Sequence, residues 1–163
     1  MFAIITYMEY YKHRIEQLKK QSVCTILYPE QFASLYVYAV EPAFTDTLSV
    51  ILEKSGRKDH IKEKLSQRLK YLEEKKHKAL LRSAWFENLK NYTKICFIKI
   101  KDSDLNIRIS VKFINFESKQ YVILISAFTE TKGGKSKTDS YSSHIKSITP
   151  ILEQIENDFK GMI

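Results

Sequence analysis

Hydrophobic residues recur with two different periods along the chain. From residue 43 to residue 80 they return every three or four positions, which predicts amphipathic helices. From residue 93 to residue 128 they alternate with polar residues, which predicts strands. The change near residue 92 therefore separates a helical segment from a sheet-forming segment.

The helical segment contains two apolar stripes, separated by Gly56. The stripes are Phe44, Leu48, Ile51 and Leu52, followed by Ile61, Leu65, Leu69 and Leu72. Gly56 suits a helix end, and so short a connection favours antiparallel neighbours. We therefore expect a helical hairpin over 43–55 and 58–80.

The alternating segment predicts an antiparallel meander over 93–101, 106–114 and 120–128. In its second strand Ile107, Ile109, Val111 and Phe113 point to one face, and Asn106, Arg108, Ser110 and Lys112 point to the other. The stretch 121–128 is apolar on both faces, as in a central strand that is covered on both sides. A further strand is expected at 34–40.

The two ends of the chain predict helices. Residues 7–20 carry an apolar stripe, and Thr149 followed by Pro150 is typical of a helix start after a basic glycine loop at 129–138. The expected fold is α+β: an antiparallel sheet, a helical hairpin on one face, a C-terminal helix and an extra N-terminal helix. We expect one domain over 1–163, with 1–33 as an extension of a core at 34–163.

Charge is concentrated in one third of the 163-residue chain. Residues 57–112 contain 16 Lys and Arg against 7 Asp and Glu, so they account for the net charge of +8. Such a local excess favours a polyanionic partner such as nucleic acid. No apolar run approaches the roughly 18 residues of a membrane span, and two cysteines suit a reducing, cytoplasmic compartment.

Motifs for metal or nucleotide chemistry are absent from the sequence. The four histidines have no ligand spacing, and there is no CxxC pair, HExxH, phosphate-binding loop or GxSxG elbow. We therefore expect no metal and no cofactor. Basic residues on and near the predicted sheet remain as candidates: Arg108, Lys112, Lys94, Lys99, Lys101, Lys132, Lys135 and Lys137.

This set suits cleavage of RNA without a metal. The ribose 2′-oxygen would attack the neighbouring phosphate, and fixed cations would stabilise the growing negative charge. Tyr141 and His144 follow the basic loop and are candidate proton shuttles.

The stretch from "WFENLKN" through "IRISVKF", "YVILISAF" and "ITPILEQIE" resembles the RelE/ParE toxin superfamily, especially its HigB-like, phage-derived branch. The resemblance covers about 34–158. It implies a toxin that cleaves mRNA, including on the ribosome, and a small acidic antitoxin protein as partner. It would make Arg108 the arginine of the family's "iRi" strand, and Lys132, Lys135 and Lys137 its basic element.

The hypothesis drawn from these observations is a metal-free endoribonuclease toxin. Arg108 and Lys112 would hold the scissile phosphate, with Tyr141 or His144 moving protons, and Lys94, Lys99, Lys101 and the loop lysines would hold the RNA backbone. The alternatives are an inactive relative, a non-catalytic nucleic-acid-binding module of phage or mobile-element origin, and a protein-interaction module. If Arg108 is structural instead, it should pair with a carboxylate such as Glu117 or Asp104.

Overall fold

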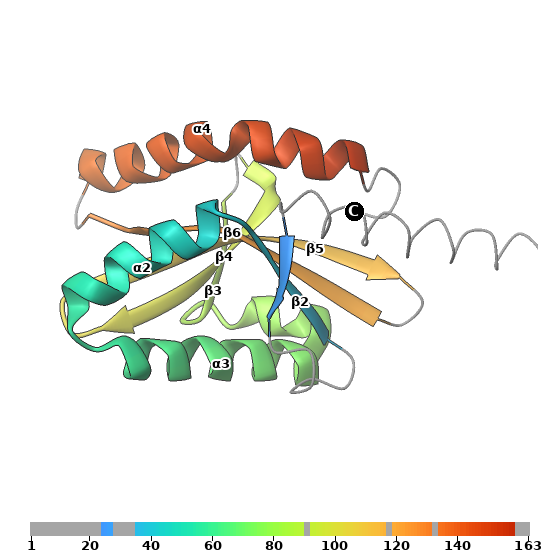
Figure 1. Ribbon diagram of the computed structural model, residues 1–163, viewed down its shortest axis with the longest axis horizontal. Coiled ribbons are helices and arrows are strands. Elements are labelled where there is room, and N and C mark those ends of the chain that lie inside the picture. Colours follow the sequence, from blue (N-terminus) through green and yellow to red (C-terminus); the bar gives the residue numbers. More distant parts are fainter. Residues whose placement is uncertain (1–23, 28–34, 90–91, 117–118, 132–133, 159–163) are drawn as a thin grey trace, which may run out of the picture.

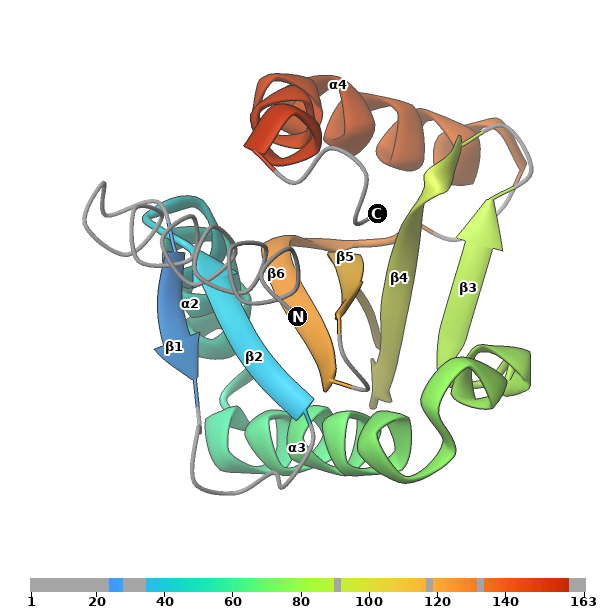
Figure 2. The same cartoon turned by 90° about the vertical axis from the view of Figure 1, so that its right-hand side faces the viewer.

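The computed structural model describes residues 24–27, 35–89, 92–116, 119–131 and 134–158. These residues form a six-stranded sheet in the order β1-β2-β6-β5-β4-β3, which Figure 2 shows edge to edge. The strands are β1 (Cys24–Leu27), β2 (Leu35–Val40), β3 (Phe86–Leu89), β4 (Tyr92–Asp102), β5 (Leu105–Phe116) and β6 (Lys119–Thr129). The helices are α2 (Ala43–Ser55), α3 (Lys58–Lys75), the short 3₁₀ helix η1 (Lys76–Leu81) and α4 (Gly134–Asp158). The predicted N-terminal helix at 7–20 lies outside the described residues.

Helices cover both faces of the sheet. The hairpin of α2 and α3 packs on one face, where the buried core includes Ile51, Leu65 and Leu69 from the helices. Helix α4 packs on the other face through Tyr141, Ile148 and others, and Figure 1 shows it on the opposite side of the sheet from α3. The α+β class, the helical hairpin and the C-terminal helix are therefore confirmed. Within the described residues, no helix is both long enough and apolar enough to cross a membrane.

The sheet is mixed rather than antiparallel throughout. Strands β4, β5 and β6 form the predicted antiparallel meander, but β2 pairs with β6 in parallel. Parallel neighbours need a long crossover connection, and α2, α3 and the first strands of the meander lie between β2 and β6. The prediction of a purely antiparallel sheet was wrong at this one pairing, because periodicity within a strand does not reveal its direction beside a distant strand.

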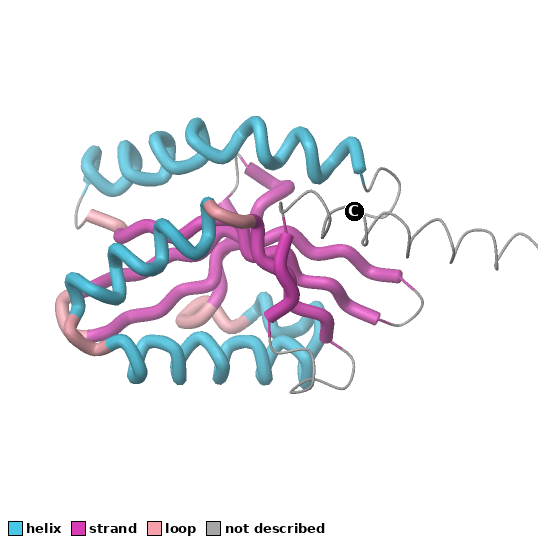
Figure 3. Tube along the Cα trace, viewed as in Figure 1, coloured by secondary structure: helices cyan, strands magenta, loops and turns pink. Residues whose placement is uncertain are grey.

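The helical hairpin agrees closely with the sequence. Helix α2 ends at Gly56, whose backbone has a φ of 64° that favours glycine. Helix α3 stops at Lys75, and η1 continues the chain to Leu81. Two four-residue strands, β1 and β3, were not predicted, since elements this short contain too few residues to show a period. Figure 3 distinguishes the helices from the strands along the trace.

Helix α4 corrects two predictions. It begins at Gly134, inside the predicted loop 129–138, and Pro150 lies within it instead of at its start. The buried residues Tyr141, Ile148 and Ile155 recur every seven positions, so one apolar stripe runs past the proline. Pro150 is exposed, and the Thr149 hydroxyl bonds the Ile145 carbonyl one turn before. Serines and lysines surround this stripe and weaken the apolar period of the sequence, so the first half of the helix was not predicted.

Candidate functional site

Arg108 lies in β5 on the sheet face that α4 covers, and only 7% of it is exposed. The alternation in β5 was predicted correctly, since Ile107 and Ile109 face the hairpin. If Arg108 and Lys112 are to hold a phosphate, the sheet face opposite the helical hairpin must be open to a ligand, but α4 lies over it. Ser110 and Lys112 are buried on the same strand for the same reason.

The Arg108 guanidinium is enclosed by two carboxylates and a phenol. Its Nη2 pairs with the Glu130 carboxylate, its Nε lies 3.6 Å from Glu87 Oε2, and its Nε donates a hydrogen bond of 2.9 Å to the Tyr141 hydroxyl. We call Glu87, Arg108, Glu130 and Tyr141 the Arg108 cluster. The arginine thus has carboxylate partners, as the structural alternative required, but they are Glu87 and Glu130 rather than Asp104. Glu117, the other predicted partner, lies outside the described residues.

Tyr141 holds its proton firmly. Its hydroxyl donates to Glu87, and its ring packs edge-on against Phe97 and Phe128 with centroids 5.3 and 5.2 Å away. Burial and the bond to Glu87 raise the pKa of Tyr141, and the neighbouring Arg108 only partly opposes this. A proton-shuttle role for this phenol at neutral pH receives little support from such an environment.

Lys112 is also enclosed. Its side chain is 2% exposed, and its Nζ lies 3.5 Å from Glu156 Oε1 on α4. A lysine in this position holds the C-terminal part of α4 to β5. The predicted pair of phosphate-binding cations, Arg108 and Lys112, therefore lies between the sheet and a helix in this conformation.

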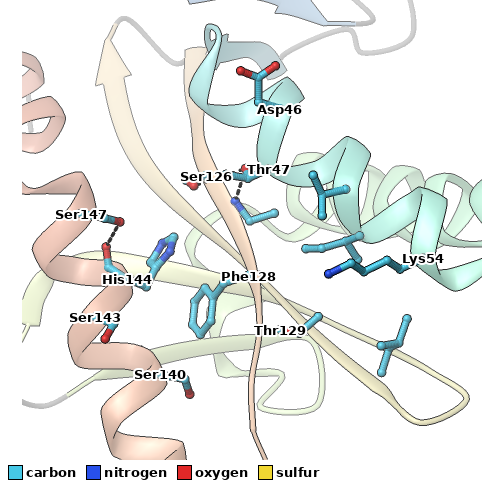
Figure 4. Close-up of a pocket in the computed structure, with 14 residues that line it drawn as sticks. Asp46, Thr47, Lys54, Ser126, Phe128, Thr129, Ser140, Ser143, His144 and Ser147 are labelled. Carbon is cyan, nitrogen blue, oxygen red and sulfur yellow. Dashed lines mark hydrogen bonds between the residues drawn. The ribbon is translucent and has the colours of Figure 1, made fainter.

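His144 projects from α4 beside a groove that opens between α2 and α4 over β6 (Figure 4). The groove has a volume of about 770 Å³. Hydroxyl side chains line it together with Phe128 and His144: Thr47, Ser126, Thr129, Ser140, Ser143 and Ser147. It is the size of a small-ligand site.

The His144 ring is held in one orientation. It stacks on Phe128 with centroids 4.3 Å apart, and its Nε2 lies 2.9 Å from the Ser110 hydroxyl. Because Ser110 donates its proton to the Ser126 carbonyl, His144 Nε2 must be the donor in the shared bond. Burial lowers the pKa of His144 to about 4, so the ring is neutral and weakly basic at pH 7.

The predicted RNA-binding lysines do not form one group. Lys99 and Lys101 lie together near the end of β4, where Lys101 is exposed and Lys99 Nζ donates to the Ser83 carbonyl. Lys94 lies earlier in β4, and Lys135 and Lys137 lie in the first turns of α4. Lys132 lies outside the described residues.

Helix α3 runs along β4 and places a row of basic side chains between them. From the helix, Lys64 Nζ donates to the Lys101 carbonyl at 2.6 Å, and Arg68 Nε donates to the Lys99 carbonyl at 3.2 Å. We call the set at this end of β4 the α3–β4 seam: Arg57, His60, Lys64, Arg68, Arg82, Lys99, Lys101 and the carboxylate Asp102. The side chains of Lys99 and Lys101 leave β4 on the face opposite to α3, because these residues pair with Arg108 and Asn106. Sequence reasoning found its two β4 lysines but not its helical members, because their stacking against β4 is a tertiary feature.

Asp102 is the acidic member of the seam and is 2% exposed. Arg57 Nε, His60 Nδ1 and Lys64 Nζ lie 2.9, 2.7 and 3.0 Å from its carboxylate oxygens. Burial alone would raise the pKa of Asp102, but hydrogen bonds from Lys64 and His60, with the charges of Lys64 and Arg57, lower it. The seam thus keeps a large positive excess around one ionised carboxylate.

Two aromatic residues extend the seam at its other end. Two guanidinium groups contact the Trp85 ring, with Arg68 Cζ 4.2 Å and Arg82 Cζ 3.4 Å from its centroid. Tyr71 meets Trp85 edge-on at 5.2 Å and lies 5.0 Å from Arg82 Cζ. We call Arg68, Tyr71, Arg82 and Trp85 the Trp85 cluster. The interleaving of "R", "W" and "Y" in the basic third of the chain was the available sequence signal for it.

Within the described residues, no three histidine, cysteine or acidic side chains converge as metal ligands would. No protein-family model matches the chain, and neither a curated protein nor a solved structure is significantly similar to it. The candidate site is therefore defined by geometry and charge, and these lead to the α3–β4 seam.

Proposed function

We propose that this protein is a non-catalytic nucleic-acid-binding module that holds a phosphate backbone along the α3–β4 seam. One observation carries the proposal: basic side chains gather on both faces of the end of β4, with Arg57, Lys64 and Arg68 on the α3 side and Lys99 and Lys101 on the other, around the carboxylate of Asp102. Such a local excess of positive charge matches the phosphates of a nucleic-acid strand.

The orientation of the side chains in the seam supports binding, in addition to their charge. Arg68 and Lys99 donate to main-chain carbonyls, which orient these side chains without pairing them with a carboxylate, whereas Lys64 donates both to a carbonyl and to Asp102. Arg57, Arg82 and Lys101 are exposed, so their guanidinium and ammonium groups can reach a ligand in solvent. Side chains that are already positioned lose less conformational entropy when a phosphate binds.

The endoribonuclease hypothesis receives less support. It needs Arg108 and Lys112 to meet a phosphate, and both are enclosed beneath α4 with acidic side chains nearby. It also needs a proton shuttle, whereas Tyr141 retains its proton and His144 is weakly basic. Membership of the RelE/ParE superfamily, cleavage of mRNA on the ribosome and an acidic antitoxin partner remain predictions from the sequence.

The test is the salt dependence of RNA binding by the intact protein. Fluorescence anisotropy of a labelled 12-nucleotide RNA should give a log–log slope of about −3, as expected for four or five phosphate contacts on a single strand. Replacing both Arg57 and Lys101 with Ala should reduce the steepness of this slope by about 1.4. The matched control is Lys146→Ala, which removes an exposed cation from α4, on the sheet face opposite to α3.

Two outcomes would contradict the proposal. One is an RNA affinity that stays the same between low and moderate salt, and the other is an equal loss of affinity in the control and seam variants. Gel analysis of the same RNA after incubation reports cleavage in parallel. Cleavage that disappears in Arg108→Ala, with the variant folded, would restore the endoribonuclease hypothesis.

A further inference from the structure

Trp85 is the only tryptophan of the chain, and it lies partly exposed at one end of the seam. The guanidinium carbons of Arg68 and Arg82 lie 4.2 and 3.4 Å from the centroid of its ring. Large aromatic rings next to cations are the groups on which single-stranded nucleic acids stack their bases. The Trp85 cluster therefore raises a question about what the seam binds.

The two arginines around Trp85 are held very differently. Arg68 is 7% exposed, and its Nε bonds the Lys99 carbonyl, which fixes it to β4. Arg82 is exposed, and within the described part of the chain its guanidinium makes ring contacts but no hydrogen bond or ion pair. Arg82 is thus a movable cover on Trp85, and Arg68 is a fixed support.

The energies favour exchange of this cover for a nucleobase. An exposed cation–π contact contributes about 0.5–1 kcal/mol. Stacking of a base on an aromatic side chain contributes about 1–3 kcal/mol. A base that displaces Arg82 therefore gains more than the protein loses, and the released guanidinium becomes available to the adjacent phosphate.

We propose that the ligand of the seam is a single-stranded nucleic acid, and that one of its bases stacks on Trp85 after displacing Arg82. This inference rests on the proposed function, because the seam must first hold the phosphate backbone. A duplex cannot make the same contact, since its bases are already stacked on one another and its outer surface presents phosphates. Single strands are therefore distinguished from duplexes by the ring, and from simple polyanions by the base.

The fluorescence of the single tryptophan tests this directly. The intact protein is titrated with oligouridylate of 12 nucleotides, with a 12-base-pair RNA duplex and with inorganic polyphosphate, and binding is followed separately by anisotropy competition. We expect strong quenching with oligouridylate alone. Equal quenching by polyphosphate would overturn the inference, because Arg82 would then move in response to charge without any base.

Variants separate stacking from charge. Trp85→Leu should weaken oligouridylate binding roughly tenfold and leave polyphosphate binding unchanged. Trp85→Phe keeps a ring in the same place and should retain most of the affinity, which also covers a leucine variant that fails to fold. Arg82→Ala should still show quenching, because it removes the cover but not the ring. An unchanged affinity in a folded Trp85→Leu variant would overturn the inference.

Failure of this inference is distinguishable from failure of the proposed function. Salt-dependent binding of all three polyanions without any change in Trp85 fluorescence rejects stacking and leaves the seam as a phosphate-binding surface. Absence of binding to every probe rejects both. Tighter binding of the duplex than of the single strand rejects the single-strand assignment and leaves the proposed function intact.

Discussion

Arg108 and Arg82 both contact aromatic side chains, and their surroundings differ in almost every other respect. Arg108 is buried under α4, where Glu87, Glu130 and Tyr141 contact its guanidinium. Arg82 is exposed at the edge of the sheet, where its guanidinium lies against the rings of Trp85 and Tyr71. Both residues belong to the same basic third of the chain, so composition alone does not distinguish them.

The difference shows what makes a cation structural. A buried guanidinium has lost its water and needs carboxylates to replace it, so the Arg108 cluster has no charge to offer a ligand without rearrangement. An exposed guanidinium keeps its water and loses little when it exchanges one weak contact for another. The Arg108 cluster therefore holds α4, β3 and β5 together, whereas the Trp85 cluster can respond to a partner.

The largest predicted effect is that of Arg108→Ala on stability. The change leaves the partly buried Glu87 and Glu130 carboxylates without the buried cation that they share, so the free energy of unfolding should fall by about 3 kcal/mol. Urea unfolding monitored by circular dichroism measures it. A loss below about 1 kcal/mol would show that α4 does not bury this cluster in solution.

The next effect is a dependence of stability on pH that comes from His144. The pKa of His144 is lowered to about 4 by burial, so between that value and its ordinary value of 6.5 the unfolded chain binds a proton that the folded chain does not. Stability should be complete above about pH 6.5 and fall by about 3 kcal/mol as the pH falls through 4. Thermal unfolding across this range provides the measurement.

The control for this pH effect is His144→Gln. A glutamine amide can donate to Ser110 as His144 Nε2 does, but it has no proton to gain. The variant should therefore lack the step in stability between about pH 4 and 6.5. If the step persists in the variant, another group is responsible and His144 is accessible to water.

A smaller effect is expected for Asp102→Asn. The change weakens hydrogen bonds from Lys64 and His60, so stability should fall by about 1–2 kcal/mol. It also removes a negative charge from the α3–β4 seam, so RNA affinity at low salt should rise about threefold. Opposite changes in unfolding free energy and RNA affinity are the expected result. Weaker RNA binding by the folded variant would contradict the location of the interface.

The smallest effect on stability is expected for Arg82→Ala, the surface counterpart of Arg108→Ala. Loss of exposed ring contacts should change the free energy of unfolding by less than about 0.5 kcal/mol. The steepness of the salt dependence of RNA binding should fall by about 0.7, which corresponds to one phosphate contact. A variant that is clearly destabilised would mean that Arg82 is structural, and the contrast between the two arginines would disappear.

The sequence by itself determined the local elements. Helices α2 and α3 and strands β4 and β5 follow from periods of 3.6 and 2, because such a helix or strand buries one side of its own residues wherever it lies. Strand β2 follows from its aromatic and β-branched residues, and β6 from an apolar run that suits burial on both faces. It also placed the positive charge in residues 57–112 and correctly assigned the alternating faces of β5.

Only the tertiary structure decided which of these faces water can reach. Helix α4 passes through a predicted loop and an internal proline, and by covering β5 it turns Arg108, Lys112 and His144 from predicted site residues into buried side chains. The packing of α3 on the sheet also places Arg68 against Trp85, which lies 17 residues later in the turn between η1 and β3. A side chain's period gives its direction from the backbone, but its exposure depends on what other segments pack there, and that information is spread over the whole chain.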